Sequence, residues 1–142
     1  MKAVLCDIDN TLSLASWRNQ YKGDWDTYHK LSTDDEPVSE IIEAVNALAA
    51  AGIAVIIITA RPERWRGITI EWLSHHRVAG DGLLMRPDDD WRPSPIVKME
   101  LAVSHFGPDL ADHVSLVIDD RDDVLEAFRA LGITCIQSWV GK

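Results

Sequence analysis

Two aspartates, Asp7 and Asp9, stand directly after an apolar run at the start of the chain. Residues 3–6 are Ala, Val, Leu and Cys, a composition typical of a strand that is buried on both faces of a parallel sheet. Acids that follow such a strand do not fit a core, and open α/β sheets carry their sites at the carboxyl ends of the strands. One aspartate can act as a nucleophile while the other acts as general acid and then as base. This spacing alone is a weak signal, but it suits phosphoryl transfer through an aspartyl-phosphate.

Two further apolar runs, 53–58 and 114–118, also end in polar side chains. In a parallel sheet the three strand ends meet at one edge, where several carboxylates repel each other. Mg²⁺ relieves this repulsion because it prefers carboxylate ligands together with water and substrate phosphate. The positive side chains of Arg61 and Lys98, together with the Thr59 hydroxyl, suit a bound phosphoryl group. The side chains at issue are Thr59, Arg61, Asp119 and Asp120, joined by Lys98 near the start of a predicted helix.

The elements that must position these residues alternate along the chain, strand with helix, about five times. This pattern predicts an α/β fold of the Rossmann-like type, with a parallel sheet of about five strands and helices on both faces. Residues 12–36 are polar and aromatic-rich, and we interpret them as a small helical cap insertion over the site, within one domain that spans 1–142. The predicted helices are 25–31, 37–51, 62–76, 96–106 and 124–131; the predicted strands are 3–6, 53–58, 82–85, 114–118 and 133–136.

The charge of the chain limits its partners. Fourteen Lys and Arg against 23 Asp and Glu leave a net charge of −9, which argues against binding an extended nucleic-acid duplex through a basic face. A small anionic site remains compatible with this charge. The sequence carries no signal peptide and no apolar run of the roughly 18–20 residues that span a bilayer, so we expect a cytoplasmic protein without a membrane partner.

In order and context, the strand-end residues resemble the four motifs of the haloacid dehalogenase (HAD) superfamily of phosphatases. The matching residues are 7–11 (Asp-Ile-Asp-Asn-Thr), 57–61 (Ile-Ile-Thr-Ala-Arg), Lys98 and 117–120 (Val-Ile-Asp-Asp). The resemblance implies an HAD-like fold, with Asp7 as the nucleophile and Asp9 as the general acid and base. It also implies that Thr59 and Lys98 contact the phosphate. The implied Mg²⁺ ligands are Asp7, the Asp9 backbone carbonyl, Asp119 and Asp120, the last directly or through water.

A closer resemblance, over nearly the whole chain, is to the 3′-phosphatase domain of bacteriophage polynucleotide kinase-phosphatases. In that family, arginines matching Arg18 and Arg61 serve the phosphatase reaction. Arg86 follows an apolar strand at the edge of the predicted site, a position that suits either a substrate contact or a surface charge. If the source is a phage, the expected location is the host cytoplasm. The expected substrate-binding residues are Arg18, Ala60, Arg61 and Arg86. The matching features are Arg18, 59–61, 84–86, 97–100, 118–121, 131–137 and Gly141.

The sequence departs from that family at two positions of the site. Asn10 replaces the usual Gly after the second aspartate, an acceptable exchange because Asn also tolerates unusual turn geometry. Ser94 stands where the family often carries an acid before the lysine. The sequence also contains no P-loop, the phosphate-binding motif of the kinase half.

Together these observations predict a Mg²⁺-dependent phosphomonoesterase that removes 3′-phosphates from nucleic-acid ends, or that acts on a nucleotide. One alternative is a small-molecule phosphatase such as a 5′-nucleotidase. Another is a non-catalytic phosphate-binding module, although the intact Asp7 and Asp9 speak against it. DNA or RNA preference and oligomeric state stay open. The insertion's aromatic residues are expected to form its own small core, with base stacking as the alternative role; they are Trp17, Tyr21, Trp25 and Tyr28.

Overall fold

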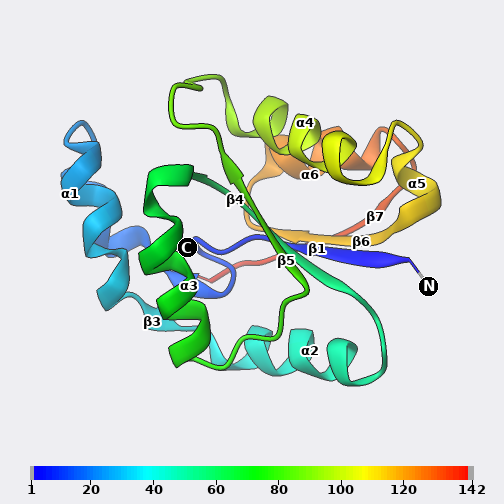
Figure 1. Cartoon of the computed structure of the whole chain (residues 1–142), viewed down its shortest axis with the longest axis horizontal. Helices are drawn as coiled ribbons and strands as arrows, with labels where there is room; N and C mark the ends of the chain where they lie inside the picture. The colour runs from blue at the N-terminus through cyan, green and yellow to red at the C-terminus, as the bar shows by residue number, and fades with distance from the viewer. Residues whose placement is uncertain (1, 141–142) are drawn as a thin grey trace.

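A five-stranded parallel sheet forms the centre of the computed structural model, which describes residues 2–140 (Figure 1). Its strand order is β5-β4-β1-β6-β7, so that β1, which precedes Asp7, lies in the middle. This arrangement confirms the predicted α/β fold. Gly141, which contributes to the resemblance, lies outside the described residues. The strands are β1 (Ala3–Cys6), β4 (Val55–Pro62), β5 (Gly82–Arg86), β6 (Val114–Asp119) and β7 (Thr134–Gln137).

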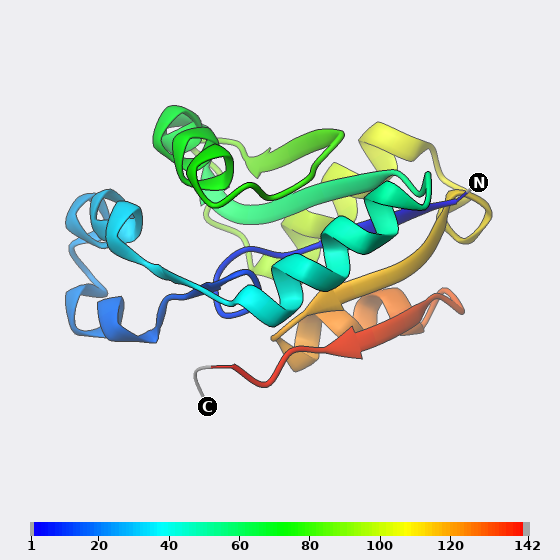
Figure 2. The ribbon, with the colours of Figure 1, turned by 90° about the horizontal axis from the view of Figure 1, so that it is seen from below.

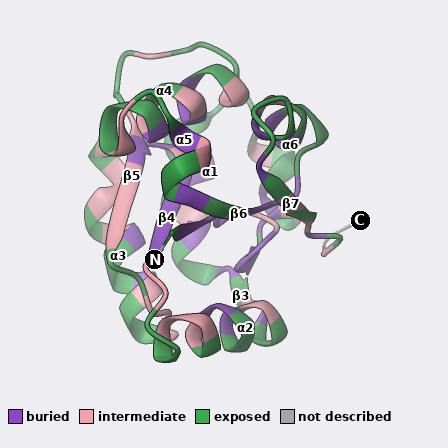
Figure 3. Ribbon diagram, turned by 90° about the vertical axis from the view of Figure 1, so that its right-hand side faces the viewer, coloured by how far each residue is buried: buried purple, intermediate pink, exposed green. Residues whose placement is uncertain are grey.

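Helices cover both faces of the sheet, and each face has its own apolar core (Figures 1 and 3). Phe128, Leu125 and Ala102 pack from one side against strand residues such as Leu5. On the other side, Val45 packs against strand residues of the opposite face. The first layer contains α4 (Ser94–Phe106), α5 (Leu110–His113) and α6 (Asp122–Arg129); the second contains α2 (Ser39–Ala50) and α3 (Arg66–His75).

Most boundaries lie within two residues of the predicted ones, and the differences that change the local structure are at α2, at the end of β4 and at α5. Helix α2 begins at Ser39 without a side-chain cap, because residues 36–37 form a short strand instead of its first turn. Strand β4 continues through Pro62, and a short 3₁₀ helix, η3 (Glu63–Trp65), precedes α3. Helix α5 was not predicted, since four residues are too few to display a helical repeat.

The segment predicted as a cap is closed at its base by a two-stranded antiparallel sheet. Strand β2 (Ser13–Leu14) pairs with β3 (Glu36–Pro37), which brings the two ends of the segment together. Between them lie η1 (Ser16–Tyr21), α1 (Trp25–Lys30) and η2 (Leu31–Asp34). The side chain of Asp24 caps α1 by accepting from the backbone N–H of Thr27.

The strand ends predicted to carry the site do meet at one edge of the sheet. The register pairs Cys6 with Ile57 on one side and with Ile118 on the other. The residues that follow these strands are therefore neighbours. Figures 1 and 2 show α1 beyond this end of the sheet, opposite the end at which β1 begins. None of the helices in residues 2–140 combines the length and the apolar character needed to cross a membrane.

Candidate active site

A tight turn after β1 separates the two aspartates of the first motif. The backbone N–H groups of Thr11, Leu12 and Ser13 all point to the carbonyl oxygen of Ile8. The turn requires Asn10 at φ 60°, a left-handed conformation that Asn adopts more readily than most residues. This confirms that Asn is a workable replacement for Gly here.

Asp7 lies at the bottom of the site, with both carboxylate oxygens engaged. Lys98 Nζ donates to Asp7 Oδ1 at 2.8 Å, and Thr11 Oγ1 donates to Asp7 Oδ2 at 3.2 Å. Lys98 Nζ also donates to Asp119 Oδ2 at 2.6 Å. The lysine is buried on α4 and therefore bridges the ends of β1 and β6.

One buried lysine does not balance the negative charge at these strand ends. Burial, and then the nearby Asp119, raise the pKa of Asp7 well above its usual value, against the opposing charge of Lys98. Burial alone would lower the pKa of Lys98, yet Asp119 and Asp7 raise it above its ordinary value. The close contact of two buried carboxylates with one cation contributes to both shifts, because Asp119 disfavours the charged form of Asp7 and both acids favour the charged form of Lys98.

The donor set at this point fits a divalent cation. Asp7, Asp119 and Asp120 are all buried, and each offers a carboxylate oxygen, all within 4.8 Å of one another. Mg²⁺ usually binds through one or two carboxylates together with waters and substrate phosphate, so this group contains enough ligands for it. A bound Mg²⁺ would supply positive charge to the phosphoryl oxygens and lower the cost of bringing a phosphate to these acids.

Asp9 occupies an opposite electrostatic environment, two residues from Asp7. Arg61 Nη2 and Arg18 Nη2 both donate to Asp9 Oδ1, each at 2.7 Å, and Arg61 Nε donates to Oδ2 at 3.2 Å. Burial would raise the pKa of Asp9, but Arg61, and then Arg18, hold it well below its usual value. Asp9 is therefore an ionised carboxylate in this arrangement.

Asp35 orients the two arginines from behind and was missed as a site residue in the sequence. Its carboxylate accepts from Arg18 Nε and Nη2, both at 2.8 Å, and lies 3.6 Å from Arg61 Nη2. The indole N–H of Trp17 donates to the same carboxylate. Nothing in the sequence of this polar segment marks Asp35, because its partners are fixed by the tertiary fold.

A cavity of about 590 Å³ opens above these groups, between the cap and the end of the sheet. Of the residues predicted for the site, those that line it are Asp7, Asp9, Ala60, Arg61, Arg86, Lys98 and Asp120. The cavity is also lined by Ser94, at the position where the related phosphatases often carry an acid.

Three predicted residues lie behind the cavity wall instead of lining it. Arg18 acts on Asp9, and Asp119 acts on Lys98, through the contacts described above. Thr59 is fully buried, and its hydroxyl oxygen accepts from the backbone N–H of Arg61 at 3.2 Å. Its contact with a phosphoryl group stays a prediction.

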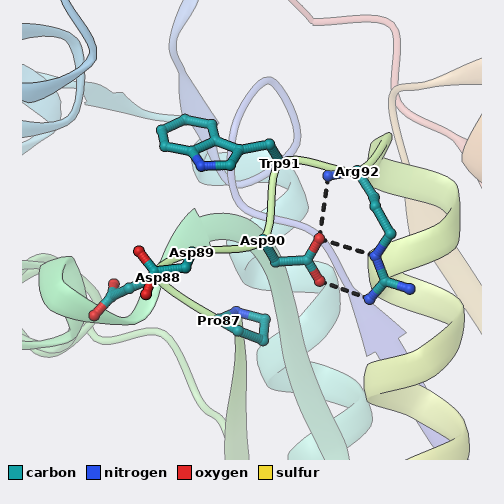
Figure 4. A pocket seen from close by; sticks show the side chains of 6 residues that line it. All are labelled: Pro87, Asp88, Asp89, Asp90, Trp91 and Arg92. Carbon is teal, nitrogen blue, oxygen red and sulfur yellow. Dashed lines mark hydrogen bonds and ion pairs between the residues drawn. The ribbon is translucent and has the colours of Figure 1, made fainter.

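Arg86 lines the cavity, but its guanidinium group also donates hydrogen bonds to backbone carbonyl oxygens of the protein. Its Nε donates to the Ala60 carbonyl oxygen, and its Nη1 donates to the carbonyl oxygens of Asp90 and Arg92. It thus ties the loop 87–92 to the second motif. A second and more open hollow, of about 750 Å³, lies against that loop (Figure 4) but includes none of the predicted catalytic residues.

Comparison with known proteins adds independent evidence. Residues 1–142 match the family model described as the polynucleotide kinase PNKP phosphatase domain. A protein of Autographa californica nuclear polyhedrosis virus, named "Putative bifunctional polynucleotide kinase/RNA ligase", is 28% identical over 137 residues, which cover 95% of this chain and 19% of the viral protein. The chain thus spans about a fifth of that relative.

Solved structures agree with this assignment. A chain in the structure of the Pnkp1/Rnl/Hen1 complex is 29% identical and superposes with a TM-score of 0.82, over 96% of this chain and 45% of that one. The crystal structure of a predicted phosphatase from Clostridium acetobutylicum shares the fold, with a TM-score of 0.71 at 13% identity, over 96% of this chain and 83% of that one. The chain therefore belongs to the PNKP phosphatase-domain family within the HAD phosphatases, and it is a phosphatase.

Proposed function

We propose that this phosphatase is Mg²⁺-dependent and removes 3′-phosphates from nucleic-acid ends through an aspartyl-phosphate on Asp7. The observation that carries the proposal is the pairing of Asp7 and Asp9 in one cavity under opposite electrostatic control. A nucleophile and a separate proton carrier are what a two-step phosphoryl transfer needs. The PNKP phosphatase family supports the choice of substrate.

In the first step, a carboxylate oxygen of Asp7 forms a bond to phosphorus, and the bond from phosphorus to the 3′-oxygen breaks. Asp9 gives its proton to that leaving oxygen. In the second step, water attacks the phosphorus, Asp9 takes the proton of the water, and the bond to Asp7 breaks to release phosphate. Asp7, Asp119, Asp120 and the Asp9 carbonyl would hold the Mg²⁺, which supplies charge stabilisation.

Asp9 must gain a proton before the first step, although its arginine partners keep it ionised. The phosphoryl group of the substrate carries more negative charge than one carboxylate, so it competes with Asp9 for the Arg61 guanidinium. When Arg61 turns to the phosphate, the pKa of Asp9 rises, because its largest stabilising partner is withdrawn. Substrate binding would therefore prepare the general acid.

The charge around the cavity favours an anionic end over a long duplex. Among the described residues, six basic and three acidic side chains line the cavity, whereas the chain as a whole carries a charge of −9. Positive charge is thus concentrated where a terminal phosphate enters. The similarity of this chain to one in the structure of the Pnkp1/Rnl/Hen1 RNA repair complex supports a role at nucleic-acid ends.

The test compares a 3′-phosphorylated oligonucleotide, its 5′-phosphorylated isomer, free 3′- and 5′-mononucleotides and an aryl phosphate, all with Mg²⁺. We expect the highest kcat/KM on the 3′-phosphorylated oligonucleotide. A higher value on a 5′-mononucleotide would instead favour a nucleotidase. Absence of hydrolysis of every monoester by folded protein would contradict the proposal and favour a phosphate-binding role.

A further inference from the structure

An exposed tryptophan, Trp91, forms part of the wall of the same cavity that contains Asp7 and Lys98. It is 71% exposed, and it lies in the loop between β5 and α4. Since Trp91 shares a cavity with the predicted nucleophile, a ligand of that site is the natural partner.

The loop holds Trp91 in place from both sides. The carbonyl oxygens of Asp90 and Arg92, its two neighbours, both accept from Arg86 Nη1, at 2.9 and 2.7 Å. Arg92 forms paired bonds with Asp90 and with Glu100 of α4. Figure 4 shows the indole directed away from the Asp90–Arg92 pair. The backbone on both sides of Trp91 is therefore fixed, which lowers the ordering entropy that stacking on its ring would cost.

The other wall of the cavity is also aromatic. Trp25 and Tyr28 of α1 line it, with their rings edge to face and 5.2 Å apart. Arg64 connects the two walls, since its side chain contacts Asp26 of α1 and its backbone N–H donates to Asp88 of the loop. Aromatic walls with cations between them are typical of sites that stack single-stranded bases.

We infer that Trp91 stacks on the nucleobase of the terminal nucleotide whose phosphate is hydrolysed. This inference rests on the proposed function and adds a base subsite to it. Any base presents a π-face, so the subsite would distinguish nucleotides from other phosphomonoesters without selecting one base. Trp91 is then a substrate-binding residue on an element outside the four motifs.

The test measures base recognition as a ratio. One oligonucleotide ends in a 3′-phosphorylated nucleotide, and a matched one ends in a 3′-phosphorylated abasic tetrahydrofuran residue. For the wild-type protein we expect kcat/KM to be about 5- to 150-fold higher with the base, the ratio that corresponds to about 1–3 kcal/mol of stacking. In Trp91→Ala the ratio should fall close to one, and Trp91→Phe should keep part of it.

Trp139 supplies the matched control, because it is 70% exposed and does not line the cavity. Trp139→Ala should keep the wild-type ratio. A wild-type ratio near one, or a full ratio in Trp91→Ala, would overturn the inference while hydrolysis of both substrates upheld the proposed function. If the wild-type protein hydrolysed neither oligonucleotide but did hydrolyse an aryl phosphate, both proposals would be wrong.

Discussion

Asp7 and Asp9 stand two residues apart, but their carboxyl groups are under opposite control. The pKa of Asp7 is raised by burial and by Asp119, whereas that of Asp9 is lowered by Arg61 and Arg18. The sequence could predict that both aspartates belong to a site, because they follow a buried apolar strand. It could not predict that their pKa values shift in opposite directions, since the groups that cause these shifts come from distant segments.

His29, on the cap helix, gives a prediction at the scale of one residue. Burial lowers its pKa to about 4, and its Nδ1 is buried without a partner. Between pH 6.5 and 4 the unfolded chain binds a proton on this imidazole and the folded chain does not, so stability falls as pH falls. The expected loss is about 1–3 kcal/mol of unfolding free energy over that window.

Urea unfolding of wild-type protein and His29→Phe across pH 4–8 measures this effect. Phenylalanine keeps a ring beside Tyr28 and Trp65, which lie 5.0 and 6.1 Å from the imidazole. The difference between the two proteins should grow as pH falls below 6.5 and stay constant above 7.5. A difference that is independent of pH would show that His29 titrates alike in both states.

At the scale of elements, the cap segment shows where sequence reasoning stops. The spacing of apolar residues predicted the long helices and the sheet strands. The β2–β3 pairing was not predictable, because strands of two residues carry no periodicity. That pairing, rather than a helical turn, precedes α2 and places Asp35 behind Arg18.

Asp35 therefore carries a prediction about how the cap is held to the site. Its side chain is fully buried between Trp17 and two arginines. Asp35→Ala should lower the unfolding free energy by about 3–5 kcal/mol, because it leaves buried guanidinium groups with one carboxylate fewer. Asp35→Asn should cost less, since an amide oxygen still accepts one of these hydrogen bonds.

Asp34 provides the control for this pair of variants. It precedes Asp35 and is exposed, so Asp34→Ala should change the unfolding free energy by no more than about 0.5 kcal/mol. Chemical denaturation of all three variants decides the matter. Equal stability of Asp35→Ala and Asp34→Ala would contradict the view that Asp35 anchors the arginines.

At the scale of the molecule, the strand order gathers acids that lie far apart in the sequence. Because β1 lies between β4 and β6, Asp7 comes beside Asp119 and Asp120. Mg²⁺ that binds this folded arrangement should raise the free energy of unfolding by about 2.7 kcal/mol at 100 times its Kd. Thermal unfolding with Mg²⁺, and with a chelator instead, should therefore differ by several degrees.

Two variants separate this site from other acids. Asp119→Asn should lose most of the Mg²⁺-dependent shift. Asp89→Asn should keep it, because Asp89 is exposed in the loop 87–92, away from the buried acids. An equal shift in wild-type protein and Asp119→Asn would place the cation elsewhere.

In the proposed reaction, Asp7 accepts the phosphoryl group from a nucleic-acid end. Rapid acid quenching of excess protein, Mg²⁺ and an oligonucleotide with a labelled 3′-phosphate tests it directly. We expect transient label on the peptide that contains Asp7, and neither label nor phosphate release with Asp7→Asn. Phosphate release by Asp7→Asn at the wild-type rate, or label on a different peptide, would contradict it.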